Sequence, residues 1–286
     1  MAAVEQVTSP ISFHGEGPVW HEDWGGLRLV DMLAGDVLTV DLPSGSVARL
    51  HLDDIAAAIR PRVSGGMVVA VERGFVLVGK DGSIERLEQL WTSKLVRMND
   101  GGTDPDGRFY CGSMAYDTTP GAGALYRLDA DRSTSVVFEG VTISNGLAWS
   151  PDGSLAYYID TPTRRVDVFD YEPDVGLVVE SRRMVVEIPA GEGGPDGMTI
   201  DGEGYLWVAL FGGSAVRRYS PAGQLDGVVE LPVSNITACT FGGANLDELY
   251  ITTSRDGLAE TDQPEAGSIF RASTGVRGLE ALPFAG

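Results

Sequence analysis

The chain has 286 residues, with 21 Lys and Arg against 41 Asp and Glu, so its formal net charge is −20. A negative charge of this size repels phosphate, which excludes a nucleic-acid-binding function. The longest apolar runs, such as residues 67–71 and 75–78, are far shorter than the roughly 20 residues of a membrane helix, so no membrane association is expected. At 43% hydrophobic and 22% charged residues, the composition is that of an ordinary globular protein.

The N-terminus and the cysteines indicate a cytoplasmic location. The first residues, MAAVEQVTSPISFHGEG, contain neither a basic start nor an apolar stretch, so no secretory signal is predicted. Cys111 and Cys239 lie far apart in the sequence and form no CxxC pair. They therefore predict neither a disulfide framework nor a zinc site, which suits a reducing compartment.

Short apolar runs with alternating character recur along the whole chain. They are rich in Val, Ile, Tyr and Phe, and Gly, Pro, Asp or Asn bounds them, which is typical of β-strands. Clear examples lie at residues 27–33, 36–42, 74–79, 108–114, 155–160, 165–171, 205–211, 215–220, 248–254 and 268–273. The one segment with helical character is the short run LDDIAAAI at residues 52–59. The pattern predicts an all-β chain.

A repeated register organises these strands. The turns DPDG, SPDG and DGEG at residues 104–107, 150–153 and 201–204 each precede an aromatic strand. Counting back from these turns and their equivalents places repeat starts near residues 16, 65, 99, 145, 196 and 239. Six units of about 45 residues match the blades of a β-propeller. We therefore predict one domain over residues 1–286, a six-bladed β-propeller with four-stranded blades, in which an N-terminal strand from VEQVTSP closes the last blade.

The repeat register also predicts a polar ring. The first strand of each propeller blade lines the central channel, so residues at one register position converge on one axis. The predicted ring consists of Glu16, Gly65, Asn99, Asn145, Asp196 and one residue among 237–239. Like charges in a narrow channel are costly unless a cation lies between them. Carboxylate and carboxamide oxygens suit Ca²⁺, Mg²⁺ or Mn²⁺ better than a structural zinc ion.

Four segments carry a resemblance to a known family. They are GEGPVW (15–20), RMNDGGTDPDGRFYCGSM (97–114), SNGLAWSPDG (144–153) and GPDGMTIDGEGYLWVA (194–209). In this order they resemble the senescence-marker-protein/gluconolactonase/regucalcin-like family of six-bladed propellers. The resemblance implies that Glu16, Asn145 and Asp196 bind one divalent metal ion. Calcium is favoured, and zinc, manganese, magnesium or iron are the alternatives.

The resemblance further implies a lactonase that opens a sugar-derived lactone. Asp196 would be the catalytic base, while Arg97, Asn99 and Asp117 would bind the substrate. A bound cation polarises a carbonyl and acidifies water, and an adjacent carboxylate can accept the proton, so the residues suit this chemistry. The sequence leaves open whether Asp196 removes a proton or only binds the metal.

Two other functions remain open at the level of sequence. The first is a calcium-dependent propeller hydrolase that acts on phosphotriesters or aryl esters. The second is a non-enzymatic calcium-binding regulatory propeller. For the lactonase, the expected partner is the small sugar lactone alone, with no nucleic acid, membrane or obligate protein partner.

Overall fold

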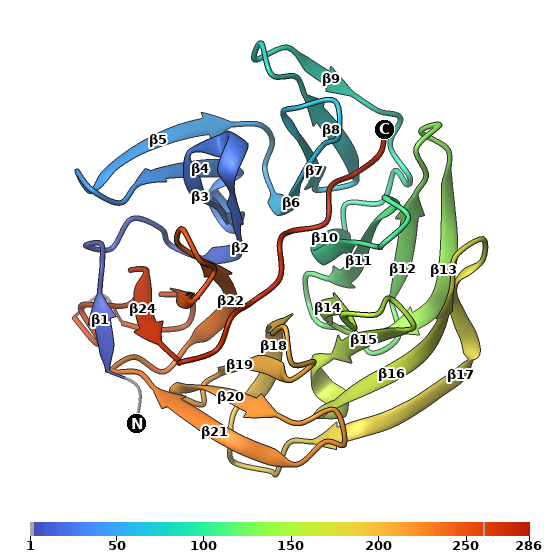
Figure 1. The fold of residues 1–286 in the computed structure, drawn as a ribbon. Coiled ribbons are helices and arrows are strands. Elements are labelled where there is room, and N and C mark those ends of the chain that lie inside the picture. Colours follow the sequence, from blue (N-terminus) through green and yellow to red (C-terminus); the bar gives the residue numbers. More distant parts are fainter. Residues whose placement is uncertain (1–2, 260) are drawn as a thin grey trace.

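The computed structural model describes residues 3–259 and 261–286, which form six four-stranded antiparallel sheets arranged as blades around a central axis (Figure 1). Blade 1 contains β2 (Gly15–His21), β3 (Gly26–Asp31), β4 (Asp36–Asp41) and β5 (Ser46–His51). Blade 2 contains β6 (Ala56–Pro61), β7 (Met67–Val71), β8 (Gly74–Val78) and β9 (Ile84–Arg86). Blade 3 contains β10 (Val96–Thr103), β11 (Phe109–Ala115), β12 (Gly123–Leu128) and β13 (Thr134–Val141).

The second half of the chain repeats the arrangement. Blade 4 contains β14 (Ser144–Trp149), β15 (Leu155–Asp160), β16 (Arg165–Glu172) and β17 (Gly176–Glu187). Blade 5 contains β18 (Gly194–Ile200), β19 (Leu206–Phe211), β20 (Ala215–Tyr219) and β21 (Leu225–Glu230). Blade 6 contains β22 (Ile236–Gly242), β23 (Glu248–Thr253), β24 (Phe270–Ser273) and the N-terminal β1 (Val4–Gln6). The predicted six-bladed all-β propeller is confirmed.

The last blade is completed by the two ends of the chain. β1 pairs antiparallel with β24, with Val4 opposite Ala272 and Gln6 opposite Phe270. This pairing confirms the predicted closure by an N-terminal strand. It also holds the first and sixth blades in one continuous ring, because β2 follows β1 directly along the chain.

The predicted helical character of residues 52–59 is wrong. In the described part of the chain, the helices are three single turns of 3₁₀ type: η1 (Glu22–Trp24), η2 (Met32–Ala34) and η3 (Thr161–Thr163). The alanines of this segment lie in β6, where Ala56, Ala57 and Ala58 are buried. Pairing with β7 and burial against the channel outweigh the modest helix propensity of alanine.

The predicted start of the second repeat at Gly65 is also wrong. Gly65 lies between β6 and β7 with a φ of +84°, a conformation that glycine adopts without strain. The innermost strand of blade 2 is β6, and Ala57 is the residue at its register shift. The turn signal at Gly65 follows the end of the inner strand, so the predicted repeat start lies outside that strand.

Aromatic contacts join neighbouring blades. Trp20 of blade 1 stacks on Tyr250 of blade 6, with ring centroids 5.5 Å apart. Tyr110 and Trp149 pack between blades 3 and 4 with centroids 5.7 Å apart. A further pair, Trp207 with Phe241, joins blades 5 and 6. Burying a large apolar side chain contributes about 1.5–3 kcal/mol, so these contacts stabilise the ring as a whole.

The C-terminal strap, defined as residues 277–286, crosses one face of the ring (Figure 1). Gly278 forms a β-bridge with Asp201 of blade 5. At the far end, the Phe284 N–H donates to the Pro61 carbonyl at 2.7 Å, and the Phe284 side chain is fully buried. The strap therefore connects blade 5 to blade 2 across the channel. Among the described residues there is no helix with the length and apolar character needed to span a membrane.

Candidate functional site

Each inner strand changes its register against the second strand of its blade. The shifts lie at Glu16–Val19, Ala56–Ala58, Met98–Gly101, Asn145–Leu147, Pro195–Met198 and Ile236–Ala238. Such a bulge bends the strand and redirects a side chain that would otherwise follow the regular alternation. The bulges therefore place the predicted ring residues Glu16, Asn99, Asn145 and Asp196 at one level, and Thr237 is the member from blade 6.

Hydrogen bonds fix the two carboxamides of the ring. The Asn99 Nδ2 donates to the Ser144 carbonyl at 2.7 Å and to the Asn145 Oδ1 at 3.3 Å. The Asn145 Nδ2 donates to the Thr161 Oγ1 at 2.8 Å, and that hydroxyl donates to the Pro195 carbonyl at 2.8 Å. Blades 3, 4 and 5 are thus linked at this level. The carboxamide orientation leaves the Asn145 Oδ1 on the side of Asn99 and the channel.

The carboxylates of Glu16 and Asp196 are buried close to each other. Burial raises the pKa of Glu16 well above its ordinary value, and the negative charge of Asp196 raises it further. Burial likewise raises the pKa of Asp196, while a hydrogen bond from the Gly197 N–H and the Asn145 carboxamide lower it in part. Two buried negative charges that interact with each other are unfavourable without a compensating cation. The electrostatics therefore match a cation-binding centre.

Asp100 is a third buried carboxylate, which the sequence did not predict: its charge raises the pKa values of Glu16 and Asp196, and it also lines the cavity on the strap side of the channel. Its Oδ1 accepts a hydrogen bond from the Gly101 N–H at 2.7 Å. Burial raises the pKa of Asp100, and the guanidinium of Arg60 opposes that rise. The run Asn99–Gly102 resembles a turn, whereas the structure places it within β10. The signal that could have found Asp100 is a bulge in this strand, because a bulge turns two consecutive residues toward the channel.

Arg97 reaches the ring from β10, as the sequence predicted. Its side chain is buried, and Nη1 donates to the Asn99 Oδ1 at 2.6 Å and to the Met98 carbonyl at 2.9 Å. The guanidinium carbon lies 5.9 Å from the centroid of the Tyr116 ring. Tyr116 is half-exposed and donates its hydroxyl to the Glu72 Oε1 at 2.6 Å. Tyr116, which the sequence reasoning did not single out, thus covers the outer side of Arg97.

Asp117 is not brought together with the buried ring residues. It is exposed, and its Oδ1 accepts hydrogen bonds from the Thr119 N–H at 3.0 Å and the Thr119 hydroxyl at 2.7 Å. These bonds lower the pKa of Asp117 and hold it in a surface turn next to Tyr116. A substrate-binding role for Asp117 stays a prediction.

His14 lies near the ring but is held in a neutral state. Its Nδ1 is 2.8 Å from the Ser254 hydroxyl. Burial lowers the pKa of His14 to about 3, and the positive charge of Arg97 contributes to this shift. The imidazole is therefore uncharged at neutral pH and does not compensate the carboxylates.

The donor set fits a hard divalent ion. Within residues 3–259 and 261–286, no three His, Cys, Asp or Glu side chains are grouped so that they could hold a metal on their own. A site at this level therefore needs a carboxamide beside the carboxylates of Glu16 and Asp196, and Asn145 supplies one. Oxygen donors of these two kinds are the ligands that Ca²⁺, Mg²⁺ and Mn²⁺ prefer.

Comparison with known proteins decides the family. The family described as SMP-30/Gluconolactonase/LRE-like region matches residues 14–255. The chain belongs to this family. Regucalcin of Sus scrofa is 40% identical over 284 residues, with 95% of each chain covered. A luciferin-regenerating enzyme has a TM-score of 0.91 at 31% identity, with both chains fully covered. A calcium-binding protein, regucalcin, from Agrobacterium tumefaciens has a TM-score of 0.93 at 25% identity, covering 99% of this chain and 97% of that one.

Proposed function

We propose that this family member is a divalent-metal-dependent lactonase that hydrolyses a sugar-derived lactone. The observation that carries the proposal is the buried group of Glu16, Asn145 and Asp196 beside Arg97 and Asn99. Two buried carboxylates with raised pKa values form an unfavourable arrangement unless a cation joins them. Membership of a family named after gluconolactonase supports the lactone as substrate.

One divalent ion would be bound by Glu16, Asn145 and Asp196. Calcium is the first candidate, because a structurally similar relative is described as a calcium-binding protein. Zinc, manganese, magnesium and iron are the alternatives, since a site with three protein ligands and open positions accepts several divalent ions. When bound, the ion would polarise the lactone carbonyl and lower the pKa of nearby water.

The protein residues would do the rest of the chemistry. Arg97 and Asn99 are joined by a hydrogen bond of 2.6 Å, so they form one rigid unit that can orient the hydroxyl groups of a sugar lactone. Asp196 would accept the proton of the attacking water as the oxygen of that water bonds to the carbonyl carbon. Cleavage of the ring C–O bond then yields a hydroxy acid, and the leaving oxygen takes up the proton.

Chelation and metal add-back test the proposal. Protein stripped of metal is assayed with gluconolactone, galactonolactone, xylonolactone and an aryl phosphotriester, with each of the five ions supplied in turn. The expected result is turnover of at least one sugar lactone above the spontaneous rate, restored by one or more ions. No lactone hydrolysis with any ion would reject the lactonase, and faster hydrolysis of the phosphotriester would favour that alternative activity.

A calcium-binding regulator without activity is the second candidate. The relatives named regucalcin favour it, because one of them is described as calcium-binding. Calcium binding by calorimetry together with no turnover in the lactone panel would support this candidate. For either function we propose a cytoplasmic location, since the two free cysteines, Cys111 and Cys239, are buried and unpaired thiols persist in a reducing compartment.

A further inference from the structure

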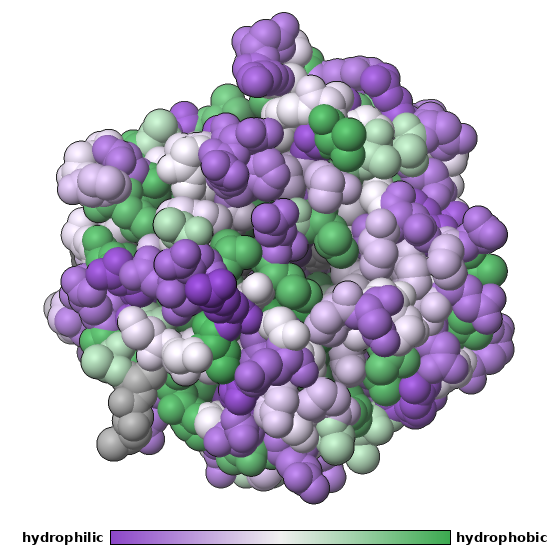
Figure 2. Space-filling view, viewed as in Figure 1, coloured by the Kyte–Doolittle hydropathy of each residue, from purple (hydrophilic) through white to green (hydrophobic). Residues whose placement is uncertain are grey.

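The central channel continues beyond the proposed metal ligands into a cavity of about 460 Å³ beside the C-terminal strap. The residues that follow four members of the ring along the chain line this cavity: Gly17, Asp100, Gly197 and Ala238. The space-filling view of this face shows a hollow near the centre of the ring (Figure 2). Asp152 and Glu280 also line the cavity and are exposed, so it opens to the solvent. The cavity and the proposed metal site are consecutive sections of one channel.

The lining of this cavity is net acidic. Among the described residues, its charged members are the carboxylates of Asp100, Asp152 and Glu280 and the guanidinium of Arg60. Arg60 is anchored, because its Nη1 donates to the Ile59 carbonyl and its Nη2 to the Gly101 carbonyl, each at 2.6 Å. A cleft with an excess of negative charge attracts cations and raises their local concentration.

Asp100 links the cavity to the metal ligands. Its side chain lines the cavity although the residue is only 7% exposed. Its Oδ1 accepts the Gly101 N–H at 2.7 Å, and no hydrogen bond from the described part of the chain reaches its Oδ2. The charge of Asp100 acts on both Glu16 and Asp196, since it raises their pKa values. An unpartnered carboxylate oxygen at this place can bind a divalent ion before the ion reaches the ring.

The other approach to the ring presents positive charge. The inner strands run from the ring toward the cavity, and Arg97 precedes Asn99 on β10, so Arg97 lies on the side away from the cavity. His14 precedes Glu16 in the same sense, and the charge of Arg97 lowers the pKa of His14, which places the two side chains near each other. A divalent cation that approaches from this side is repelled by the Arg97 guanidinium, whereas a neutral lactone is not.

We propose that the divalent ion enters and leaves its site from the strap side, through the cavity and past Asp100, while the lactone enters from the Arg97 side. The proposal rests on the metal site of the proposed function. The cavity is large enough for a hydrated ion, because six waters at about 30 Å³ each occupy roughly 180 Å³. Asp100 replaces part of this hydration shell before Glu16 and Asp196 bind the ion. Metal exchange and lactone binding thus use opposite ends of one channel.

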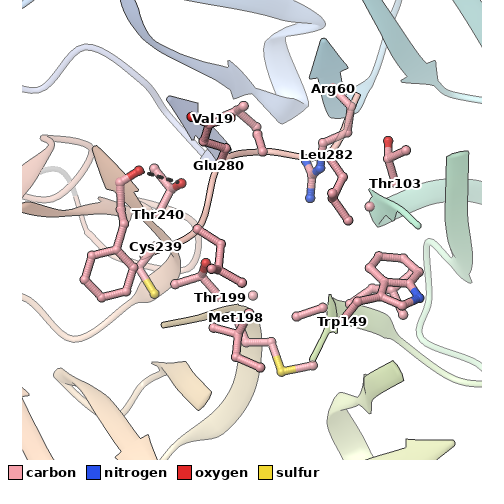
Figure 3. Close-up of a pocket in the computed structure, with 18 of the residues that line it drawn as sticks. Val19, Arg60, Thr103, Trp149, Met198, Thr199, Cys239, Thr240, Glu280 and Leu282 are labelled. Carbon is pink, nitrogen blue, oxygen red and sulfur yellow. Dashed lines mark hydrogen bonds between the residues drawn. The ribbon is translucent and has the colours of Figure 1, made fainter. Parts of the chain in front are cut away.

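Calcium exchange kinetics with a narrowed cavity test this path. Thr199 lies across the cavity from Arg60, so Thr199→Phe constricts the space (Figure 3). The full chain is loaded with calcium and mixed with excess Quin-2 in a stopped-flow instrument to measure release. Calorimetry gives the Kd, and the two values together give the association rate. A constriction slows both directions equally, so we expect both rates to fall about tenfold with a Kd within about twofold of wild type.

A matched variant controls for the added ring. Thr134→Phe lies at an exposed position of the outer strand β13 and should leave both rates unchanged. A wild-type release rate in folded Thr199→Phe would reject the path through the cavity.

Two charge variants test the role of the carboxylates. Glu280→Lys should slow calcium association about threefold at low salt and less at high salt, because it reverses a charge at the cavity mouth. Glu230→Lys, at an exposed position of β21, is the matched control, and an equal effect of both would show that only net charge matters. Asp100→Asn should lower the association rate about tenfold. A faster release alone would show that Asp100 stabilises the bound ion without lying on its path.

The Arg97 side provides the reciprocal test. Tyr116→Ala removes the ring that covers Arg97 and should leave both calcium rates within about twofold of wild type. Faster release in Tyr116→Ala would place the exit on that side and overturn the proposal.

The outcomes separate the entry path from the proposed function. If calcium binds at Glu16 and Asp196 with rates that Thr199→Phe does not change, only the path fails. If Thr199→Phe slows exchange but no lactone is hydrolysed, only the lactonase fails. If none of the five divalent ions binds, or if Glu16→Gln leaves the affinity unchanged, both proposals fail.

Discussion

The two ends of the central channel are built by the same six inner strands, yet they differ in chemistry. At one end, the buried carboxylates of Glu16 and Asp196 lie beside the carboxamides of Asn99 and Asn145. At the other end, a cavity beside the strap is lined by apolar side chains such as Trp149, Met198 and Leu282, and also by the charged residues Arg60, Asp100, Asp152 and Glu280. The backbone scaffold is common to both ends. The difference shows that the two ends of one propeller channel can present unlike side chains, because each blade contributes one short strand whose successive residues can vary independently.

The largest expected effect concerns Asp196 at the acidic end. Asp196→Asn keeps an oxygen at nearly the same place and removes the only group we assign as base, so kcat should fall by roughly 10²–10⁴. The assay uses saturating metal and subtracts spontaneous lactone opening. Asp131→Asn, in an exposed turn closed by Ser133, is the matched control and should retain wild-type kcat. Recovery of kcat in Asp196→Asn with excess metal would leave Asp196 as a metal ligand only.

The second prediction concerns the C-terminal strap. Phe284 is fully buried at the end of the strap, so Phe284→Ala should lower the free energy of unfolding by about 3–5 kcal/mol. Leu279→Ala in the same strap should cost much less, since Leu279 is 40% exposed. Urea unfolding of both variants measures the difference. Lactone KM and metal affinity of folded Phe284→Ala should stay near wild type if the two ends are independent, and a loss of metal binding would contradict that separation.

The third prediction concerns the proposed metal ligands. Glu16→Gln and Asn145→Ala should each weaken metal binding at least tenfold, which corresponds to about 1.4 kcal/mol. The fold should remain, because the apolar contacts between blades are untouched. Calorimetric titration of the folded variants gives the affinities, with Glu139→Gln on the exposed face of β13 as control. Unchanged affinity in both ring variants would show that the metal binds elsewhere.

The smallest expected effect concerns Tyr116, which covers Arg97. An arginine over an aromatic ring at a partly exposed site contributes about 0.5–1 kcal/mol, so Tyr116→Ala should raise KM about two- to fivefold. Tyr116→Phe keeps the ring and should restore the wild-type KM, although it loses the hydroxyl bond to Glu72. Steady-state kinetics at saturating metal distinguish the two variants. Equal KM values for both would show that the ring does not position Arg97.

The sequence predicts much of the fold, because strand alternation and turn residues are local signals. It predicts five of the six repeat starts near the inner strands and also the closing strand β1, but it misplaces the second start at Gly65. The apolar run before Gly65 contains three alanines, which do not alternate with polar residues as a half-buried strand does. A strand buried on both faces loses that alternation, so periodicity cannot identify it.

The site was predictable to a lesser degree. The positions of Glu16, Asn99, Asn145 and Asp196 follow from the repeat register and the family resemblance. Asp100 was missed because the bulge that redirects it depends on pairing between β10 and β11, which the sequence does not display. The cavity beside the strap could not be predicted from the sequence for another reason. Arg60 and Leu282 are far apart in the sequence, and only the path of the strap brings them to one compartment.

The pairing of β1 with β24 has a consequence for how the molecule assembles. Blade 6 combines residues 4–6 with residues 236–273, so it cannot be completed until almost the whole chain has left the ribosome. Contacts between such distant segments form slowly, because closing a long loop costs entropy before the contact stabilises it. Blades 1–5 each contain consecutive strands and can pair as they emerge. We therefore expect an open arc of five blades to form first, with ring closure as the slow final step.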